Sequence, residues 1–246
     1  MNVPARPLLP HLLPNVRDAG GLRTEDGHRL RHRKFLRSGA LIRLIPATAH
    51  ALTGYTGPAT YLDLRTDGEV EKGGEPIALM AHGWQWQRVP LCDREPGDWG
   101  TAPEDQLRRY REHWPLYTDA ARTVASSLRH GPVVVGCQLG KDRTGMVVAL
   151  VLWWLGVERQ DIIEDFELSN RCLIQGHRLL PPPWHDPRCR PGVAAGWVCA
   201  AVIDAIGTGT LQPGARSDLK ILRRDLRCSP PDPTPDQTLG RRPEMR

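Results

Sequence analysis

Short apolar runs alternate with segments of helical pattern between Ala59 and Arg227. The runs Tyr61–Leu64, Trp84–Val89 and Pro132–Gly136 predict strands, and helical patterns lie between and after them. Pro132–Gly136 is continuous and rich in β-branched residues, which is typical of a central strand covered on both faces. We therefore expect an α/β fold with a central, mainly parallel sheet and helices on both faces.

The two ends of the chain differ from this pattern. Residues 7–41 are rich in Arg, Gly and turn formers, and Asp26-Gly27 stands between Leu22–Thr24 and His28–Leu30, which predicts a hairpin. We expect a short N-terminal β element here. Residues 229–246 hold five prolines and three arginines and almost nothing apolar, so we expect a disordered tail.

The longest apolar stretch, Met146–Leu155, is about half of the roughly 20 residues that a membrane-spanning helix needs, so it predicts a buried helix. Residues 1–14 contain prolines in their apolar patch and one Arg, unlike a secretory signal. The length of 246 residues suits one domain. We expect a cytoplasmic protein without an integral membrane segment.

The net charge of +5 suggests a nucleic-acid partner only until the basic residues are examined. Of 33 basic residues 29 are Arg, and they are spread along the chain rather than gathered in one stripe. We therefore expect no nucleic-acid binding. The cysteines, at 92, 137, 172, 189, 199 and 228, include no CxxC pair, which argues against a disulfide framework and a zinc ribbon.

A loop of unusual composition joins the predicted central strand to the apolar helix. It reads Cys-Gln-Leu-Gly-Lys-Asp-Arg-Thr-Gly from Cys137 to Gly145. A tight loop between a strand and a helix brings backbone N–H groups and the positive end of the helix to one point. This order predicts a phosphate-binding loop.

Three side chains of this loop are expected to act on a bound phosphoryl group. Cys137, at a helix N-terminus and near a guanidinium, should ionise near neutral pH and attack phosphorus. Arg143 offers a planar fork for two phosphoryl oxygens, and the Thr144 hydroxyl could bond the sulfur and help it leave. Cys172 precedes Arg178 at the same spacing, but prolines rather than a helix follow it, so context favours Cys137.

The loop resembles the active-site loop of the protein tyrosine phosphatase superfamily, in the bacterial branch of atypical tyrosine/dual-specificity and phosphoinositide phosphatases. Other segments resemble motifs of that branch in the same order: residues 15–21, 35–41, 62–65 and 165–170. The resemblance implies a single phosphatase domain over residues 1–228, with a core at 15–170 and a C-terminal helical part at 171–228.

The resemblance also implies roles for individual residues, without any metal or other cofactor. Cys137 and Arg143 would be catalytic, and residues of the loop would hold the phosphoryl group: Gln138, Leu139, Gly140, Lys141, Asp142, Arg143 and Thr144. A general acid is needed for the leaving oxygen. Asp93, after a strand, is our first candidate, and Asp142 in the loop is the second. Asp63 is a third candidate, or a strand-end residue that pairs with Arg65 or Arg17.

Two positions depart from the branch. Gly136 stands where the superfamily usually has His, and Leu139 stands where the branch usually has Ala. The thiolate is then expected to be less stabilised and the loop bulkier. Residues 181–191 are proline-rich, so we expect a loop here in place of the usual helical lid. Lys141 is expected to add a second positive charge at the pocket rim.

Several alternatives stay open. The substrate could be a phosphorylated protein, a phosphoinositide or a small phosphorylated metabolite, and a catalytically impaired relative could bind phosphorylated partners through the same loop. Four residues of the C-terminal part offer a different interpretation, a zinc site: Cys172, His177, His185 and Cys189. The oligomeric state is not indicated by the sequence.

Overall fold

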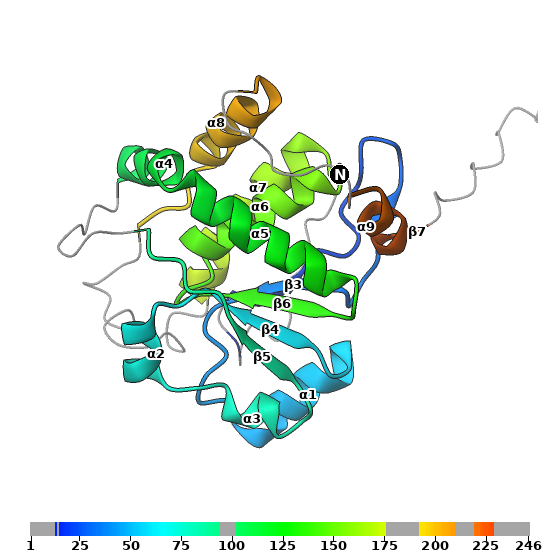
Figure 1. Ribbon diagram of the computed structural model, residues 1–246, viewed down its shortest axis with the longest axis vertical. Coiled ribbons are helices and arrows are strands. Elements are labelled where there is room, and N and C mark those ends of the chain that lie inside the picture. Colours follow the sequence, from blue (N-terminus) through cyan, green and yellow to red (C-terminus); the bar gives the residue numbers. More distant parts are fainter. Residues whose placement is uncertain (1–12, 14, 94–101, 176–191, 210–218, 229–246) are drawn as a thin grey trace, which may run out of the picture.

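The computed structural model describes residue 13 and residues 15–93, 102–175, 192–209 and 219–228. Its main sheet has the strand order β1-β3-β6-β4-β5 (Figure 1). These strands are β1 (Arg17–Asp18), β3 (Phe35–Ser38), β6 (Val133–Gly136), β4 (Thr60–Asp63) and β5 (Gln85–Arg88). All are parallel except β1, which is antiparallel to β3. The expected mainly parallel sheet is therefore confirmed.

Helices cover both faces of the sheet, as expected (Figure 1). On one face α1 and α3 pack against Leu36, Tyr61 and Val134. On the other face α5 and α6 pack against Val133 and Val135. The helices are α1 (Pro46–Thr56), α2 (Asp67–Gly73), α3 (Ile77–Met80), α4 (Pro103–Glu112), α5 (Trp114–Leu128), α6 (Asp142–Trp154), α7 (Arg159–Gln175), α8 (Gly196–Gly207) and α9 (Leu219–Leu226).

The three strands predicted from apolar runs correspond to β4, β5 and β6, with ends that differ by one residue. The predicted helix at Met146–Leu155 is α6, but it begins at Asp142. The polar first turn is thus already helical, and Arg143 within it binds Glu69 of α2. Strand β3 did not stand out from the arginine-rich pattern around it, yet it lies beside the central strand β6.

The N-terminal β element is present in a form that differs from a simple hairpin. The turn at Asp26-Gly27 exists, with Gly27 at φ 84° and a single bridge between Arg23 and Arg29. Strand β2 (Arg29–Leu30) pairs instead with β7 (Arg227–Cys228), almost two hundred positions later. The N-terminal part is therefore tied to the C-terminal segment.

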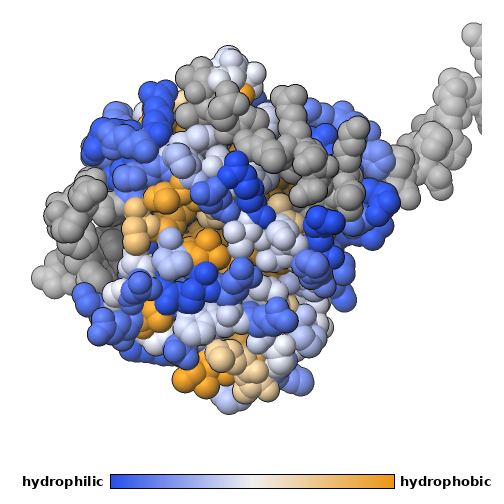
Figure 2. All heavy atoms as spheres, viewed as in Figure 1, coloured by the Kyte–Doolittle hydropathy of each residue, from blue (hydrophilic) through white to orange (hydrophobic). Residues whose placement is uncertain are grey.

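The surface is mainly hydrophilic on the face drawn in Figure 2, with an apolar area beside the ends of the strands. A second apolar area lies at the lower end, where Figure 1 places α1 and α3. Among the described residues no helix combines the length and the apolar character that crossing a bilayer requires. The expected disordered tail and the proline-rich loop both lie outside the described residues.

Candidate active site

The candidate site lies at the carboxyl end of β6, the central strand. Cys137 directly follows β6 and is buried, and α6 begins five residues later at Asp142. Gly140 takes a φ of 67°, and a Cβ there would lie 2.2 Å from the Ser38 carbonyl oxygen. Only glycine fits this combination of left-handed backbone and close contact. The loop therefore follows a tight path against the end of β3.

Three consecutive carbonyls of this loop are held by groups outside it. The Gln138 carbonyl accepts from the Ala40 N–H at 3.2 Å, the Leu139 carbonyl from Asn15 Nδ2 at 2.9 Å, and the Gly140 carbonyl from Arg37 Nη2 at 2.7 Å. In a trans peptide the N–H points opposite to the carbonyl. The N–H groups of residues 139–141 therefore face away from these partners, toward the inside of the loop.

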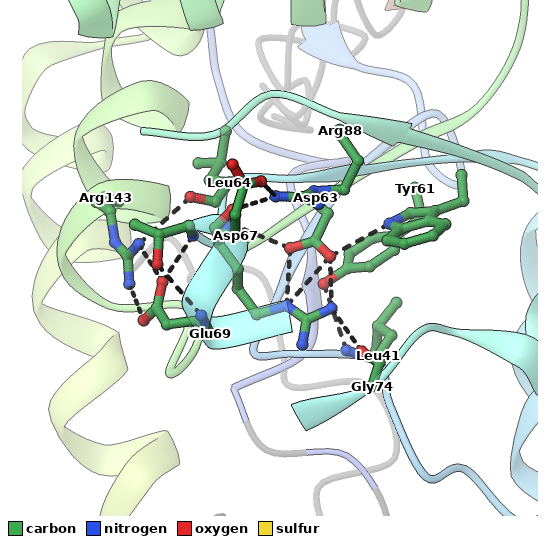
Figure 3. Close-up of polar contacts among 12 residues, drawn as sticks. Leu41, Tyr61, Asp63, Leu64, Asp67, Glu69, Gly74, Arg88 and Arg143 are labelled. Carbon is green, nitrogen blue, oxygen red and sulfur yellow. Dashed lines mark hydrogen bonds and ion pairs between the residues drawn. The ribbon is translucent and has the colours of Figure 1, made fainter. Parts of the chain in front are cut away.

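Arg143, in the first turn of α6, is fixed by Glu69 of α2 (Figure 3). Two parallel bonds join the guanidinium to the carboxylate: Nη1 to Oε2 at 2.7 Å and Nη2 to Oε1 at 2.6 Å. Burial opposes the charge, but the bonds from Glu69 and the nearby charges of Cys137, Glu69 and Asp93 raise the pKa of Arg143 above its ordinary value. The guanidinium is thus charged and held in one orientation.

Glu69 was not singled out by the sequence. It is the third residue of α2, where it also closes a capping box with Thr66. Burial works against its ionisation, yet Arg143 and Thr66 lower the pKa of Glu69. The capping pattern Thr-x-x-Glu is visible in the sequence, but it predicts only a helix start. The contact with Arg143, 74 positions away, is not local and left no signal.

A buried ionic network holds the loop against β3 and α7. Asp165 of α7 receives Arg17 Nε at 2.7 Å and Arg37 Nη1 at 2.7 Å, and Ser169 Oγ accepts from both arginines. Although burial opposes it, the two guanidiniums hold the pKa of Asp165 below its usual value. Because Arg37 also binds the Gly140 carbonyl, this network fixes the loop to β3 and α7.

Comparison with known proteins identifies the family of this chain. A model of a family described as the tyrosine phosphatase family matches residues 11–183, which is more than half of the chain. This chain belongs to the tyrosine phosphatase family. It is 30% identical over 193 residues to the triple specificity protein phosphatase PtpB of Mycobacterium tuberculosis, covering 65% of this chain and 68% of the relative.

Other similar proteins have a lower sequence identity to this chain. A tyrosine-protein phosphatase of Nostoc commune is 29% identical over 147 residues, covering 56% of this chain and 49% of the relative. This chain thus spans about half to two thirds of the length of the curated relatives it matches. The crystal structure of P. aeruginosa TpbA shares 16% identity with a TM-score of 0.40, over 84% of this chain and 95% of that chain.

Within this family member the three candidate acids have different surroundings. Asp93 is buried, and its Oδ2 accepts a 2.6 Å hydrogen bond from the Tyr117 hydroxyl. Asp142 forms an ion pair with Lys141 instead. Asp63 is buried in a bidentate pair with Arg65, with Oδ1 to Nε at 2.9 Å and Oδ2 to Nη2 at 2.6 Å (Figure 3). Asp63 thus pairs with Arg65 rather than with Arg17, as one of our two interpretations held.

Two expectations about side chains of the loop are corrected. Lys141 is not a free charge at the pocket rim, because its side chain is 3% exposed and pairs with Asp142. The Thr144 hydroxyl is buried and has no hydrogen-bond partner among the described residues, so the expected bond to sulfur is not formed. Leu139 packs against Leu173 of α7, which explains how the loop accommodates this larger residue.

The alternative cysteine is part of a helix. Cys172 lies within α7 and is buried, and burial raises the pKa of its thiol. A buried helical thiol without a converging loop is not a nucleophile. The zinc interpretation is not tested, because His177, His185 and Cys189 lie outside the described residues.

Proposed function

We propose that this chain is a cysteine-dependent phosphatase that hydrolyses a phosphate monoester through a phosphocysteine intermediate. The observation that carries this proposal is the loop of residues 137–143. Its carbonyls are held outward, Cys137 lies at its base, and Arg143 is fixed beside it by Glu69. N–H groups that converge with a charged guanidinium stabilise the charge of a phosphoryl group in transfer.

The reaction has two steps. The Cys137 thiolate attacks phosphorus, the bond to the leaving oxygen breaks, and that oxygen takes a proton from a carboxylic acid. A water molecule then gives a proton to the same carboxylate and attacks the phosphocysteine, which releases inorganic phosphate and restores the thiolate. The N–H groups of the loop and Arg143 hold the three phosphoryl oxygens in both steps.

Asp93 is our proposed general acid and Asp142 the second candidate. The Tyr117 hydroxyl donates to Oδ2 of Asp93, and this bond can persist when Oδ1 carries a proton. The Asp142 carboxylate is engaged in an ion pair with the Lys141 ammonium. Within the described part of the chain, Asp93 is therefore the candidate whose carboxyl group is not engaged in an ion pair with a neighbouring loop residue.

As substrate we propose a phosphorylated protein, with phosphotyrosine as the first choice and dual specificity allowed. The names of the relatives support this choice, since the Nostoc commune protein is called a tyrosine-protein phosphatase and the Mycobacterium protein a triple specificity protein phosphatase. A panel of phosphotyrosine and phosphoserine peptides, a phosphoinositide and small phosphorylated metabolites would rank the substrate classes.

The mechanism is tested with paired cysteine variants. Cys137→Ser should abolish turnover of an aryl phosphate while phosphate binding persists, whereas Cys172→Ser should keep the rate within a few-fold. Activity should survive EDTA and be blocked by vanadate, because the loop and Arg143 do what ions do in a metallophosphatase. Equal loss in both variants, or loss of activity on chelation, would contradict the proposal.

The general acid is tested by pH profiles of kcat. Asp93→Asn should lower kcat for a poor leaving group and remove the fall of rate at high pH, and Asp142→Asn should keep that fall. The reverse pattern would assign the proton transfer to Asp142.

A further inference from the structure

Gly136, just before the nucleophile, has no room for a side chain. A Cβ there would lie 2.8 Å from the hydroxyl and from Cε2 of Tyr61, and 2.9 Å from Ser38 Oγ. Contacts this short require a neighbour to move, and both neighbours are fully buried. The space that a residue at 136 would fill is thus already occupied by Tyr61.

Strand register explains how Tyr61 reaches this place. Tyr61 of β4 pairs with Val134 of β6, and Ser38 of β3 pairs with Gly136. Residues two apart on a strand share a face and lie about 6.6 Å apart, which is close to the length of a tyrosine side chain. The ring therefore starts beside Val134 and extends along the sheet to Gly136.

The Tyr61 hydroxyl also holds a segment that supports the loop. It accepts a hydrogen bond from the Leu41 N–H at 3.4 Å (Figure 3). Leu41 ends the turn of residues 38–41, in which the Ala40 N–H binds the Gln138 carbonyl and the Ser38 carbonyl lies against Gly140. One hydroxyl thus touches the base of the loop at Gly136 and secures the turn along its side.

The Tyr61 hydroxyl is uncharged, which allows it to stay buried beside the loop. Burial, and then the charge of Asp63, raise the pKa of Tyr61 above its ordinary value, so the phenol keeps its proton. Beside it, the buried Ser38 hydroxyl has no hydrogen-bond partner among the described residues. Two neutral hydroxyls therefore surround Gly136.

We propose that Tyr61 is a positioning residue for Cys137. Its ring occupies the space that a side chain at position 136, just before the nucleophile, would otherwise fill. This inference rests on the proposed function, because it assumes that Cys137 is the nucleophile. Tyr61 acts through the backbone of Gly136 and through the turn of residues 38–41, and does not touch the phosphate.

A double-mutant cycle tests whether a large side chain at position 61 requires a glycine at position 136. Gly136→His alone should lower kcat and the midpoint of thermal unfolding, since its Cβ collides with Tyr61. Tyr61→Val alone leaves an empty space beside the loop and should also lower kcat. The double variant should recover at least about tenfold in kcat over the worse single variant, a coupling typical of residues in contact.

A milder variant covers the case in which Gly136→His does not fold. Tyr61→Phe keeps the ring and removes only the hydroxyl, so thermal unfolding should change little. Its kcat should fall about fivefold, the equivalent of one ordinary hydrogen bond. The midpoint of the pH dependence of Cys137 alkylation by iodoacetamide should rise, because the turn that supports the loop is no longer secured. KM should stay near the native value.

Tyr55→Phe is the matched control. The Tyr55 hydroxyl donates to Asp18 Oδ2 at 2.8 Å, outside the loop of residues 137–143, so the alkylation profile of Tyr55→Phe should match that of the native protein. The inference is overturned if Tyr61→Phe and Tyr55→Phe give the same profile, or if Gly136→His alone retains native kcat. Alkylation reports on Cys137 without turnover, so an inactive native protein would contradict the proposed function and leave this comparison valid.

Discussion

At the scale of single residues, the bond between Arg143 and Glu69 decides how the candidate site is organised. An arginine that is free to rotate would lose side-chain entropy each time it bound a phosphoryl group. Glu69 holds the fork through two bonds before any ligand arrives. Binding energy is then available for the transition state rather than for ordering the side chain.

Glu69→Gln tests this preorganisation. Glutamine can still close the capping box with Thr66, so the helix should stay folded. Loss of the charge and of one of the two parallel bonds should reduce kcat by about 10- to 100-fold, with a smaller change of KM, because a misplaced group costs rate above all. Steady-state kinetics with an aryl phosphate measures both values.

Glu71→Gln is the control for this experiment, because Glu71 lies on the same short helix and is exposed. Its kcat should equal that of the native protein. If Glu69→Gln is equally active, Arg143 does not depend on Glu69 for its orientation.

At the scale of elements, the path of the loop backbone is held by contacts with neighbouring segments as well as by its own sequence. Its order of strand, Cys, Gly, Arg and helix was sufficient to predict a loop between β6 and α6. The partners of its carbonyls, Asn15 and Arg37, could not be predicted, because these contacts join segments more than 100 positions apart. Residue periodicity reports on burial and gives no information about such pairings.

The same distinction explains the other outcomes. The apolar runs predicted β4 and β6 because burial on both faces leaves a continuous pattern. Strand β5, at the edge of the sheet, alternates exposed and partly buried residues instead. Strand β3 was missed, since Arg37 faces the ionic network and interrupts its apolar run. Lys141 was placed at the pocket rim because charged residues are usually exposed. Its burial beside the Asp142 carboxylate was not predicted.

Asp165→Asn should destabilise the protein, because Asp165 joins α7 to the two buried arginines beneath the loop. Two buried guanidiniums would lose their shared carboxylate, so the free energy of unfolding should fall by about 3–5 kcal/mol. Because the folded pKa of Asp165 is below its unfolded value, its contribution is present above about pH 4 and is lost as the pH falls further. Urea unfolding should be measured between about pH 2.5 and 7, which spans the range where carboxyl groups titrate. The free energy of unfolding should depend less on pH in the variant than in the native protein.

Asp204→Asn supplies the comparison for Asp165. Asp204 pairs with Arg159 on the surface, and its side chain is 57% exposed. Solvent screens such a pair, so the loss should stay below about 1 kcal/mol. Similar losses in the two variants would show that the buried network adds no more than an exposed ion pair.

At the scale of the whole molecule, the far end of α6 is held by the C-terminal segment. Arg223 Nε donates to the Trp154 carbonyl at 2.7 Å, and Arg227 Nη2 donates to the Leu155 carbonyl at 2.7 Å. These carbonyls are at the C-terminus of α6, where the helix leaves them without internal partners and where positive charge is favourable. Residues 219–228 thus stabilise the helix whose opposite end begins at the candidate site.

Arg223→Ala should therefore lower the free energy of unfolding by about 1.5–3 kcal/mol, the usual contribution of a hydrogen bond from a charged group. Alkylation of Cys137 should keep its native pH dependence, because the change lies at the other end of the helix. Chemical denaturation and iodoacetamide titration of the same sample provide both values.

Arg224→Ala should leave stability within about 0.5 kcal/mol of native, since surface substitutions away from such contacts are usually this small. Arg224 is adjacent in sequence but is 78% exposed and pairs only with neighbouring Asp225 among the described residues. An equal loss for both arginines would contradict a specific role of Arg223.

The ionic support of the loop has a consequence for the order in which the molecule assembles. Asn15 and Arg37 are synthesised long before the carbonyls they hold, and Asp165, which orients Arg37, is synthesised after the loop. A nascent chain that ends just beyond Arg143 contains the whole reactive sequence but lacks the helix that fixes it. The loop that carries Cys137 is therefore held in place by Arg37 and Asp165 only when a contact spanning 128 positions has closed, and such non-local contacts slow folding.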